Sequence, residues 1–157
     1  MKLRSPHKLG RLALSAALFL AALPALAAGP YQFFAVSPCR LVDTRQPNGP
    51  NAGPVIQRMT QRDFQVQGKC GVPVGAKAAA LNLTVLNATG TGWIAAWPSG
   101  TTQPAVSNVN VLNGENGLSN GAIVPLSTNA NDLSTFTFLG ATNGTMNLVI
   151  DVNGYFM

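Results

Sequence analysis

The residues best able to do chemistry are concentrated in one short stretch, CRLVDTR, which runs from Cys39 to Arg45. It contains Arg40, Asp43 and Arg45, in a chain of which only 10% is charged. Arginine and aspartate at this spacing can form hydrogen-bonded ion pairs, and a guanidinium group can also bind the carboxylate or phosphate of a ligand. The stretch therefore predicts either a structural ion-pair cluster or a site that binds an anion.

Strand geometry favours the structural interpretation of this cluster. If residues 40–45 form a regular strand, its side chains alternate between two faces, and each face carries a charge. A charge near the core is tolerated only when it is paired and hydrogen-bonded. Asp43 can pair with Arg45, and Asp151 near the C-terminus is a further partner for either arginine. We predict a cluster that joins the first and last strands, with a ligand-facing arginine pair as the alternative. Its members are Arg40, Asp43, Arg45 and Asp151.

Two tryptophans in the segment GWIAAWP form a second candidate site. Trp93 and Trp97 are four residues apart, so on a strand they share one face at a separation of roughly 13 Å. Two such rings could stack on a glycan while nearby Asn and Thr side chains bind its hydroxyl groups. The alternative is that both rings pack in the core, with the small Ala95 between them.

The N-terminus has the organisation of a secretory signal peptide. The basic segment MKLRSPHKLGR precedes the apolar run LALSAALFLAALPALAA, in which Ala25 and Ala27 have the spacing that a signal peptidase recognises. The run is short for a bilayer and contains Pro24, so a transmembrane anchor is the weaker alternative. We expect residues 1–27 to be removed and residues 28–157 to form one exported domain.

The basic character of the full chain belongs largely to this leader. The net charge is +5 from ten basic and five acidic residues, and four of the basic residues lie in the leader. The mature protein is therefore close to neutral and lacks the clustered cations that nucleic-acid binding requires. We expect its partners to be a cell-surface glycan, another extracellular protein or further copies of itself, with no membrane association after cleavage.

Catalysis, a metal site and a cofactor are not expected of this chain. Its single histidine, His7, leaves with the leader, so the most common general base is missing. The spacing of the acidic residues does not suggest the carboxylate pair of a glycosidase, and no nucleophilic serine motif lies near Lys69 or Lys77. Two cysteines without a histidine cannot complete a structural zinc site.

Cys39 and Cys70 are the two cysteines of the chain. An even number of cysteines in an exported protein predicts a disulfide, and two free thiols are the alternative. A bridge that closes a loop of about 30 residues stabilises by roughly 3–4 kcal/mol in the loop-entropy description. The Pro/Gly-rich segment QPNGPNAGP, residues 46–54, lies inside this ring and is predicted to be a surface loop.

The sequence after the leader predicts an all-β fold. Short runs of alternating apolar and polar residues recur between clusters of Gly, Pro, Asn, Ser and Thr. The clearest runs are ALNLTVLN, SNVNVLN, STFTFLG and MNLVIDVNGYF. Regular short strands separated by turn residues favour an antiparallel β-sandwich of the jelly-roll or immunoglobulin-like type, with one disulfide.

Four segments in order carry a likeness to a known class of module. They are PCRLVDTR, CGVPVGAKAAALNLTVLNATGTGWIAAWPSG, SNVNVLNGENGLSNGAIVPL and NLVIDVNGYF. Together they resemble a β-rich module of bacterial secreted and cell-surface proteins, which opens with a PCRLxDTR-type motif and closes with a VDVxGYF-type motif. This module is often appended to wall hydrolases or surface repeat proteins. The resemblance implies an extracellular location and an accessory, non-catalytic role.

These observations converge on one expected function. We expect a secreted, non-catalytic module with a structural or interaction role, in the extracellular space or at the bacterial cell surface. A carbohydrate-binding module that uses Trp93 and Trp97 to contact a glycan or the cell wall is the alternative.

Overall fold

The structure is a computed structural model that describes residues 30–157 of the chain. The signal peptide predicted for residues 1–27 lies outside the described residues. Within the described range the chain forms nine strands and no helix. The prediction of an all-β fold is therefore confirmed. The same range contains no helix that is long and apolar enough to cross a membrane.

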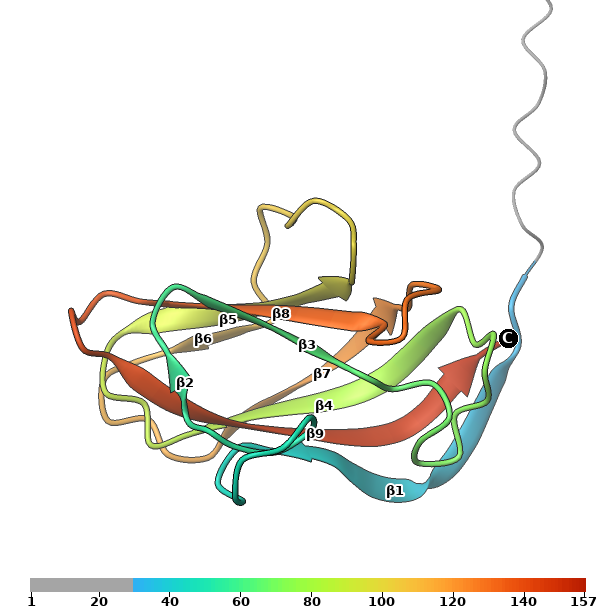
Figure 1. The fold of residues 1–157 in the computed structure, drawn as a ribbon, viewed down its shortest axis with the longest axis horizontal. Helices are drawn as coiled ribbons and strands as arrows, with labels where there is room; N and C mark the ends of the chain where they lie inside the picture. The colour runs from blue at the N-terminus through green and yellow to red at the C-terminus, as the bar shows by residue number, and fades with distance from the viewer. Residues whose placement is uncertain (1–29) are drawn as a thin grey trace, which may run out of the picture.

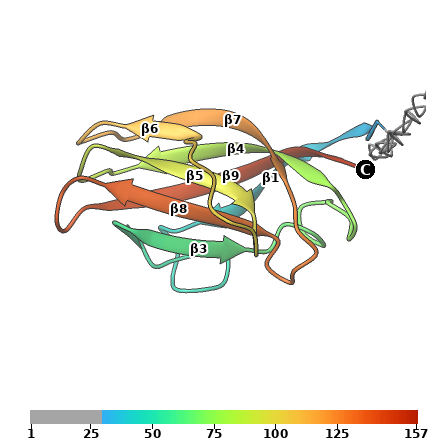
Figure 2. The same ribbon diagram turned by 90° about the horizontal axis from the view of Figure 1, so that it is seen from above.

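The strands form two antiparallel sheets that pack face to face (Figure 1). The first, called the β9 sheet below, has the order β1-β9-β4-β7, with the short β2 paired to β9. The second, the β8 sheet, has the order β3-β8-β5-β6 and lies across the first (Figure 2). The strands of the β9 sheet are β1 (Phe33–Asp43), β2 (Ile56–Gln57), β4 (Ala78–Leu86), β7 (Leu118–Pro125) and β9 (Thr145–Phe156). Those of the β8 sheet are β3 (Thr60–Phe64), β5 (Gly92–Pro98), β6 (Val109–Val111) and β8 (Leu133–Leu139).

The strand pairing is nested from the ends of the chain inward. It places β1 beside β9, β3 beside β8, β4 beside β7 and β5 beside β6, with every pair antiparallel. One long hairpin wrapped around a common core produces this order, which is that of a jelly roll. The predicted antiparallel sandwich is confirmed, and the strand order distinguishes the jelly roll from the immunoglobulin-like alternative.

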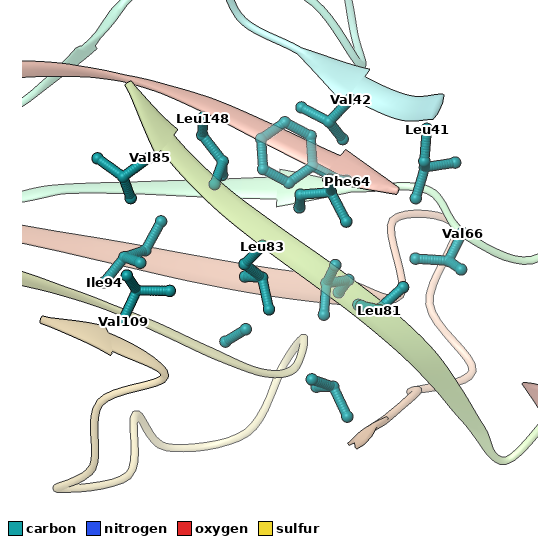
Figure 3. Packing of buried hydrophobic residues seen from close by; sticks show 14 of the residues in the cluster. Leu41, Val42, Phe64, Val66, Leu81, Leu83, Val85, Ile94, Val109 and Leu148 are labelled. Atoms are coloured by element: carbon teal, nitrogen blue, oxygen red, sulfur yellow. The ribbon is translucent and has the colours of Figure 1, made fainter. Parts of the chain in front are cut away.

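The inner faces of the two sheets form one hydrophobic core (Figure 3). Along β4 burial alternates, so that Leu81, Leu83 and Val85 are at most 2% exposed while the residues between them are half-buried. Ile94 and Phe64 reach the same core from the β8 sheet. Burying a side chain of this size contributes about 1.5–3 kcal/mol, so β4 is most stable with its leucine and valine face turned toward the other sheet.

Strand β8 inverts the usual arrangement of apolar and polar residues. Thr135 and Thr137 lie on the core-facing side and are at most 1% exposed, whereas Phe136 and Phe138 lie on the outer side and are half-buried. The Thr135 hydroxyl donates to the backbone carbonyl of Arg62 at 3.2 Å. The Thr137 hydroxyl is buried and has no hydrogen-bond partner within the described part of the chain. The sheet therefore buries hydroxyl groups and presents aromatic rings outward.

Strand β1 departs from regular alternation near its C-terminal end. Its register against β9 shifts between Arg40 and Val42, and both Leu41 and Val42 are buried. The uninterrupted alternation expected for residues 40–45 is therefore wrong. A β-bulge inserts one extra residue, Leu41, and so turns two successive apolar side chains inward.

The predicted disulfide between Cys39 and Cys70 is confirmed, with the two Cα atoms 5.5 Å apart. It connects β1 to the loop between β3 and β4. Residues 46–54 lie in the connection between β1 and β2, outside the named strands, as the Pro/Gly-rich composition predicted. The bridge thus attaches the first strand of the β9 sheet to the segment that leaves the β8 sheet.

The unpaired hydroxyl of Thr137 gives a stability prediction. Thr137→Val keeps the shape of the side chain and removes a buried polar group without a partner. We expect the free energy of unfolding to rise by about 1–2 kcal/mol, on the scale of the cost of an unsatisfied buried group.

Thr135→Val is the matched control on the same strand. It leaves the backbone carbonyl of Arg62 without its hydroxyl donor, so the same measurement, urea denaturation, should show a loss of stability. A Thr137→Val protein that is less stable than the parent would show that this hydroxyl is satisfied in solution.

Candidate functional site

The predicted ion-pair cluster lies where β1 ends. Arg45 donates from Nε to Oδ1 of Asp43 at 2.8 Å and from Nη2 to Oδ2 at 2.7 Å. The backbone N–H of Arg45 also donates to Oδ1 at 3.1 Å. Asp43 is only 6% exposed. The bidentate arginine therefore supplies the enclosed carboxylate with both a counter-ion and hydrogen bonds, which a buried charge requires.

A second pair connects neighbouring strands of the β9 sheet. Arg40 on β1 donates from Nε and Nη2 to the two carboxylate oxygens of Asp151 on β9, at 2.8 and 3.2 Å. Its Nη1 atom is 3.7 Å from Oδ2 of Asp43, so the two pairs form one cluster. The side chains of Arg40 and Arg45 are 50% and 41% exposed. The structure brings all four predicted residues together, with the carboxylates more enclosed than the guanidinium groups.

The cluster changes the acidity of its buried carboxylate. Hydrogen bonding from the Arg45 side chain is the main reason that the pKa of Asp43 falls from 3.8 to about 2. Burial acts in the opposite direction, because desolvation favours the neutral acid. A folded-state pKa below the unfolded value stabilises the fold at pH values above 3.8, and this contribution is lost as the pH falls toward 2.

Acid titration of the Asp43→Asn variant checks this contribution. At neutral pH we expect the variant to be less stable than the parent, because an amide cannot replace the charged partner of Arg45. The difference in the free energy of unfolding should narrow between pH 3.8 and about pH 2, as the parent's carboxyl takes up its proton. Denaturant unfolding of both proteins across this pH range measures the stability difference. A difference that does not change with pH would contradict a lowered pKa for Asp43.

The loop at residues 46–54 is held by side chains that sequence analysis did not single out. Arg62 on β3 donates from Nη1 to the carbonyl of Pro54 and from Nη2 to that of Ala52, both at 3.0 Å. Asn51 donates from its side chain to two further backbone carbonyls, at 3.2 and 3.0 Å. Local spacing contains no signal for these contacts, because the loop and β3 meet only after the two sheets have packed.

Trp97 does not have the position that ligand stacking requires. It is 3% exposed, and its indole N–H donates to the carbonyl of Thr101 at 3.2 Å. Thr101 belongs to the loop between β5 and β6, which rises from the outer side of the β8 sheet (Figure 1). The predicted two-ring platform of Trp93 and Trp97 is therefore wrong, because this loop covers one of the rings.

Trp93 remains half-buried on the same outer face and has other aromatic neighbours. The centroids of Phe136 and Phe138 are 5.7 and 5.8 Å from that of Trp93, and the Phe138 ring is inclined to it by only 21°. Both phenylalanines face outward because of the inversion of β8. We call Trp93, Phe136 and Phe138 the aromatic cluster.

A groove of about 680 Å³ lies between Trp93 and the β5–β6 loop. The loop lines it with residues 103–107, among which Val106 is 55% exposed. None of the side chains lining the groove is charged. A concave, uncharged surface with an aromatic wall suits a neutral ligand that has an apolar face.

Amide side chains flank the aromatic cluster on both sides. Asn110 on β6 is the cross-strand partner of Trp93 and is exposed. Gln61 on β3 is the cross-strand partner of Phe136, is exposed, and donates to Asp63 at 3.0 Å. Amides offer both donors and acceptors. The outer face of the β8 sheet thus combines aromatic rings with groups that can bind hydroxyls.

Two further acidic side chains of the described range, Asp132 and Asp63, have structural partners. Asp132 is fully buried and accepts the backbone N–H groups of Val66 and Gln67, both at 2.8 Å. Asp63 accepts the Ser134 hydroxyl at 2.7 Å. In residues 30–157, no group of three or more His, Cys, Asp or Glu side chains is placed to hold a metal ion. Asp132 and Asp63 thus have hydrogen-bonding roles within the fold.

Comparison with known proteins does not assign the chain to a family. No protein-family model matches the sequence, and no curated protein matches it. Among solved structures, the coat protein of Tobacco streak virus, described as a dimer, is similar with a TM-score of 0.35 and 9% sequence identity. The match covers 81% of this chain and 88% of that chain. A likeness at this level carries no argument about function.

Proposed function

We propose that this chain is an extracellular, non-catalytic interaction module that binds its partner in the groove beside Trp93. The observation that carries the proposal is a half-buried tryptophan in an uncharged groove of about 680 Å³. The core uses the inner faces of both sheets, so the outer faces are the surfaces open to a partner. The disulfide between Cys39 and Cys70 supports an oxidising compartment.

The composition of the groove favours a glycan as the partner. A pyranose ring has an apolar face of C–H groups that packs on an aromatic ring, and hydroxyl groups at its edge that bind amides. Trp93 supplies the ring, while Gln103 in the loop and Asn110 on β6 supply amides. This is the carbohydrate-binding alternative of the sequence analysis, with Trp93 as the stacking residue and Trp97 as a support of the loop.

The cellular setting is part of the same proposal. The signal peptide predicted for residues 1–27 and the resemblance to modules of bacterial surface proteins support export to the cell surface. A glycan of the cell wall is the partner that this setting makes available. A protein partner or a second copy of the chain would use the same outer face and is an outcome of the test below.

Substitution of the two tryptophans separates binding from folding. We expect Trp93→Ala to lower binding of the mature protein to peptidoglycan or to its best ligand on a glycan array by about tenfold or more. Removing a stacking ring from a binding site costs on this scale. The variant's melting temperature should fall less than that of Trp97→Ala, because Trp93 is only half-buried. Pull-down and array signals measure the binding, and thermal unfolding measures the fold.

Trp97→Ala is the matched control. It removes a buried indole and its hydrogen bond to Thr101, so the free energy of unfolding should fall by about 3–5 kcal/mol. If Trp93→Ala and the parent bind glycans equally well, the groove is not the site. A parent protein that binds no glycan but binds an extracellular protein through Trp93 would replace the glycan by a protein partner.

A further inference from the structure

The outer face of the β9 sheet carries a trough on the opposite side of the sandwich from the aromatic cluster. Two hollows of about 410 and 420 Å³ lie side by side there, and Asn153 lines both of them. One hollow extends toward Arg40 and Asp151, and the other toward Ala80 and Ile123. Together they form a depression that crosses the sheet from β1 to β7.

The first hollow is polar. Arg40, Asp151 and Asn82 occupy one row across β1, β9 and β4, because each is the cross-strand partner of the next. The Asn82 amide makes one long contact, 3.4 Å to the Thr84 hydroxyl. The described part of the chain provides no hydrogen-bond partner for the exposed side chain of Asn153. Donors and acceptors of both amides therefore remain available at the surface.

The ion pair at this end also keeps hydrogen-bonding capacity. Each carboxylate oxygen of Asp151 accepts one bond from Arg40, and each has a second lone pair. The Nη1 group of Arg40 is 3.7 Å from Oδ2 of Asp43, which is beyond hydrogen-bond distance. The pair thus offers acceptors on Asp151 beside a donor on Arg40.

The second hollow is lined mainly by apolar residues, and it forms because small residues make up its floor. Gly121 continues the Asn82 row onto β7, and Ala80 lies beside Ile123 in the next row. Ile123 is 65% exposed. A Cβ atom at Gly121 would meet no atom within 4 Å, so nothing covers the sheet at that point.

The electrostatics of the trough favour an uncharged ligand. Arg40 faces two carboxylates, Asp151 and Asp43, at 2.8 and 3.7 Å, so an anion would have to compete with both. A metal cation would have to displace a bidentate guanidinium group from Asp151. A neutral group that donates to Asp151 and accepts from the amides meets neither obstacle.

We propose that this trough is a second binding site and that it takes a neutral, hydroxyl-rich ligand, a sugar residue. Adjacent hydroxyl groups of the sugar bind Asp151, Asn82 and Asn153, and its C–H face packs on Ile123. The site is independent of the groove beside Trp93, which belongs to the other sheet. A chain with both sites filled holds two sugars on opposite faces.

Chemical-shift mapping tests the site with defined probes. The side-chain amide signals of Asn82 and Asn153 report on the trough, while the indole signal of Trp93 reports on the groove. The probes are the methyl glycosides of glucose, galactose, mannose and N-acetylglucosamine, with sodium sulfate and calcium chloride as charged competitors. We expect at least one glycoside at millimolar concentration to shift both amide signals, and neither salt to do so.

Variants of Gly121 and of the amides confirm the location. Gly121→Leu should abolish the amide shifts, because its side chain fills an open part of the trough, whereas the matched Gly121→Ala should retain them. Asn82→Ala combined with Asn153→Ala removes both reporter amides, so binding is followed there by the backbone amide signal of Gly121, and it should weaken by about tenfold, the scale of losing hydrogen bonds to the ligand. In Trp93→Ala the glycoside should still shift the Asn82 and Asn153 amide signals. Loss of binding in the groove can therefore be distinguished from loss of binding in the trough.

Three outcomes would overturn the proposal. Glycosides that shift only the Trp93 indole signal, or no signal, would leave the trough without a sugar ligand. Sulfate or calcium shifting the Asn82 and Asn153 amides where glycosides do not would assign the hollow to an ion. Glycoside shifts that persist unchanged in Gly121→Leu would place the ligand elsewhere on the sheet.

Discussion

Asp43 is a carboxylate that the fold encloses at the point where β1 ends. Its charge is tolerated because Arg45 binds it through two side-chain donors and a backbone N–H, with Arg40 as a second cation. Arg40 also pairs with Asp151 on β9, the strand that pairs with β1 in the sheet. Neutralising the buried charge and aligning the first and last strands are therefore linked. The disulfide at Cys39 attaches the same strand to the segment that leaves the β8 sheet.

The jelly roll has consequences for where this molecule can bind. The inner faces of both sheets are buried in one hydrophobic core. A binding partner must therefore contact an outer face, a sheet edge or a loop. On the β8 sheet the outer face gains rings because β8 turns Phe136 and Phe138 outward, and the β5–β6 loop adds a wall beside Trp93. On the β9 sheet small residues such as Gly121 form the floor of a hollow beside polar side chains. The two faces thus offer stacking on one side and hydrogen bonding on the other.

The disulfide and the ion pairs could be predicted from the sequence, because few residues of the required types are present. Contacts between a loop and a distant strand could not be predicted, because they form only when the sheets pack. The pairing of Cys39 with Cys70 followed from having two cysteines, and the partners of Asp43 followed from the scarcity of charge. Strand period places Trp97 on the face of Trp93, and the sequence left two interpretations open for the pair, a ligand platform and packing in the core. A loop that follows the strand folds back over that ring, and no local pattern indicates it. The clamp that Arg62 forms on the β1–β2 loop was missed for the same reason.

The sequence by itself determined that the chain forms short alternating strands and that one disulfide closes a ring near its start. Both follow from local properties, a period of two residues and an even number of cysteines. Alternation does not say which of its two faces turns inward. In STFTFLG only the tertiary structure decided that Thr135 and Thr137 face the core and that the phenylalanines face out. The reason is that alternation places Leu133 and Leu139 on the same face as the two threonines, and both leucines are fully buried in the core that Phe64 and Ile94 of the neighbouring strands also reach.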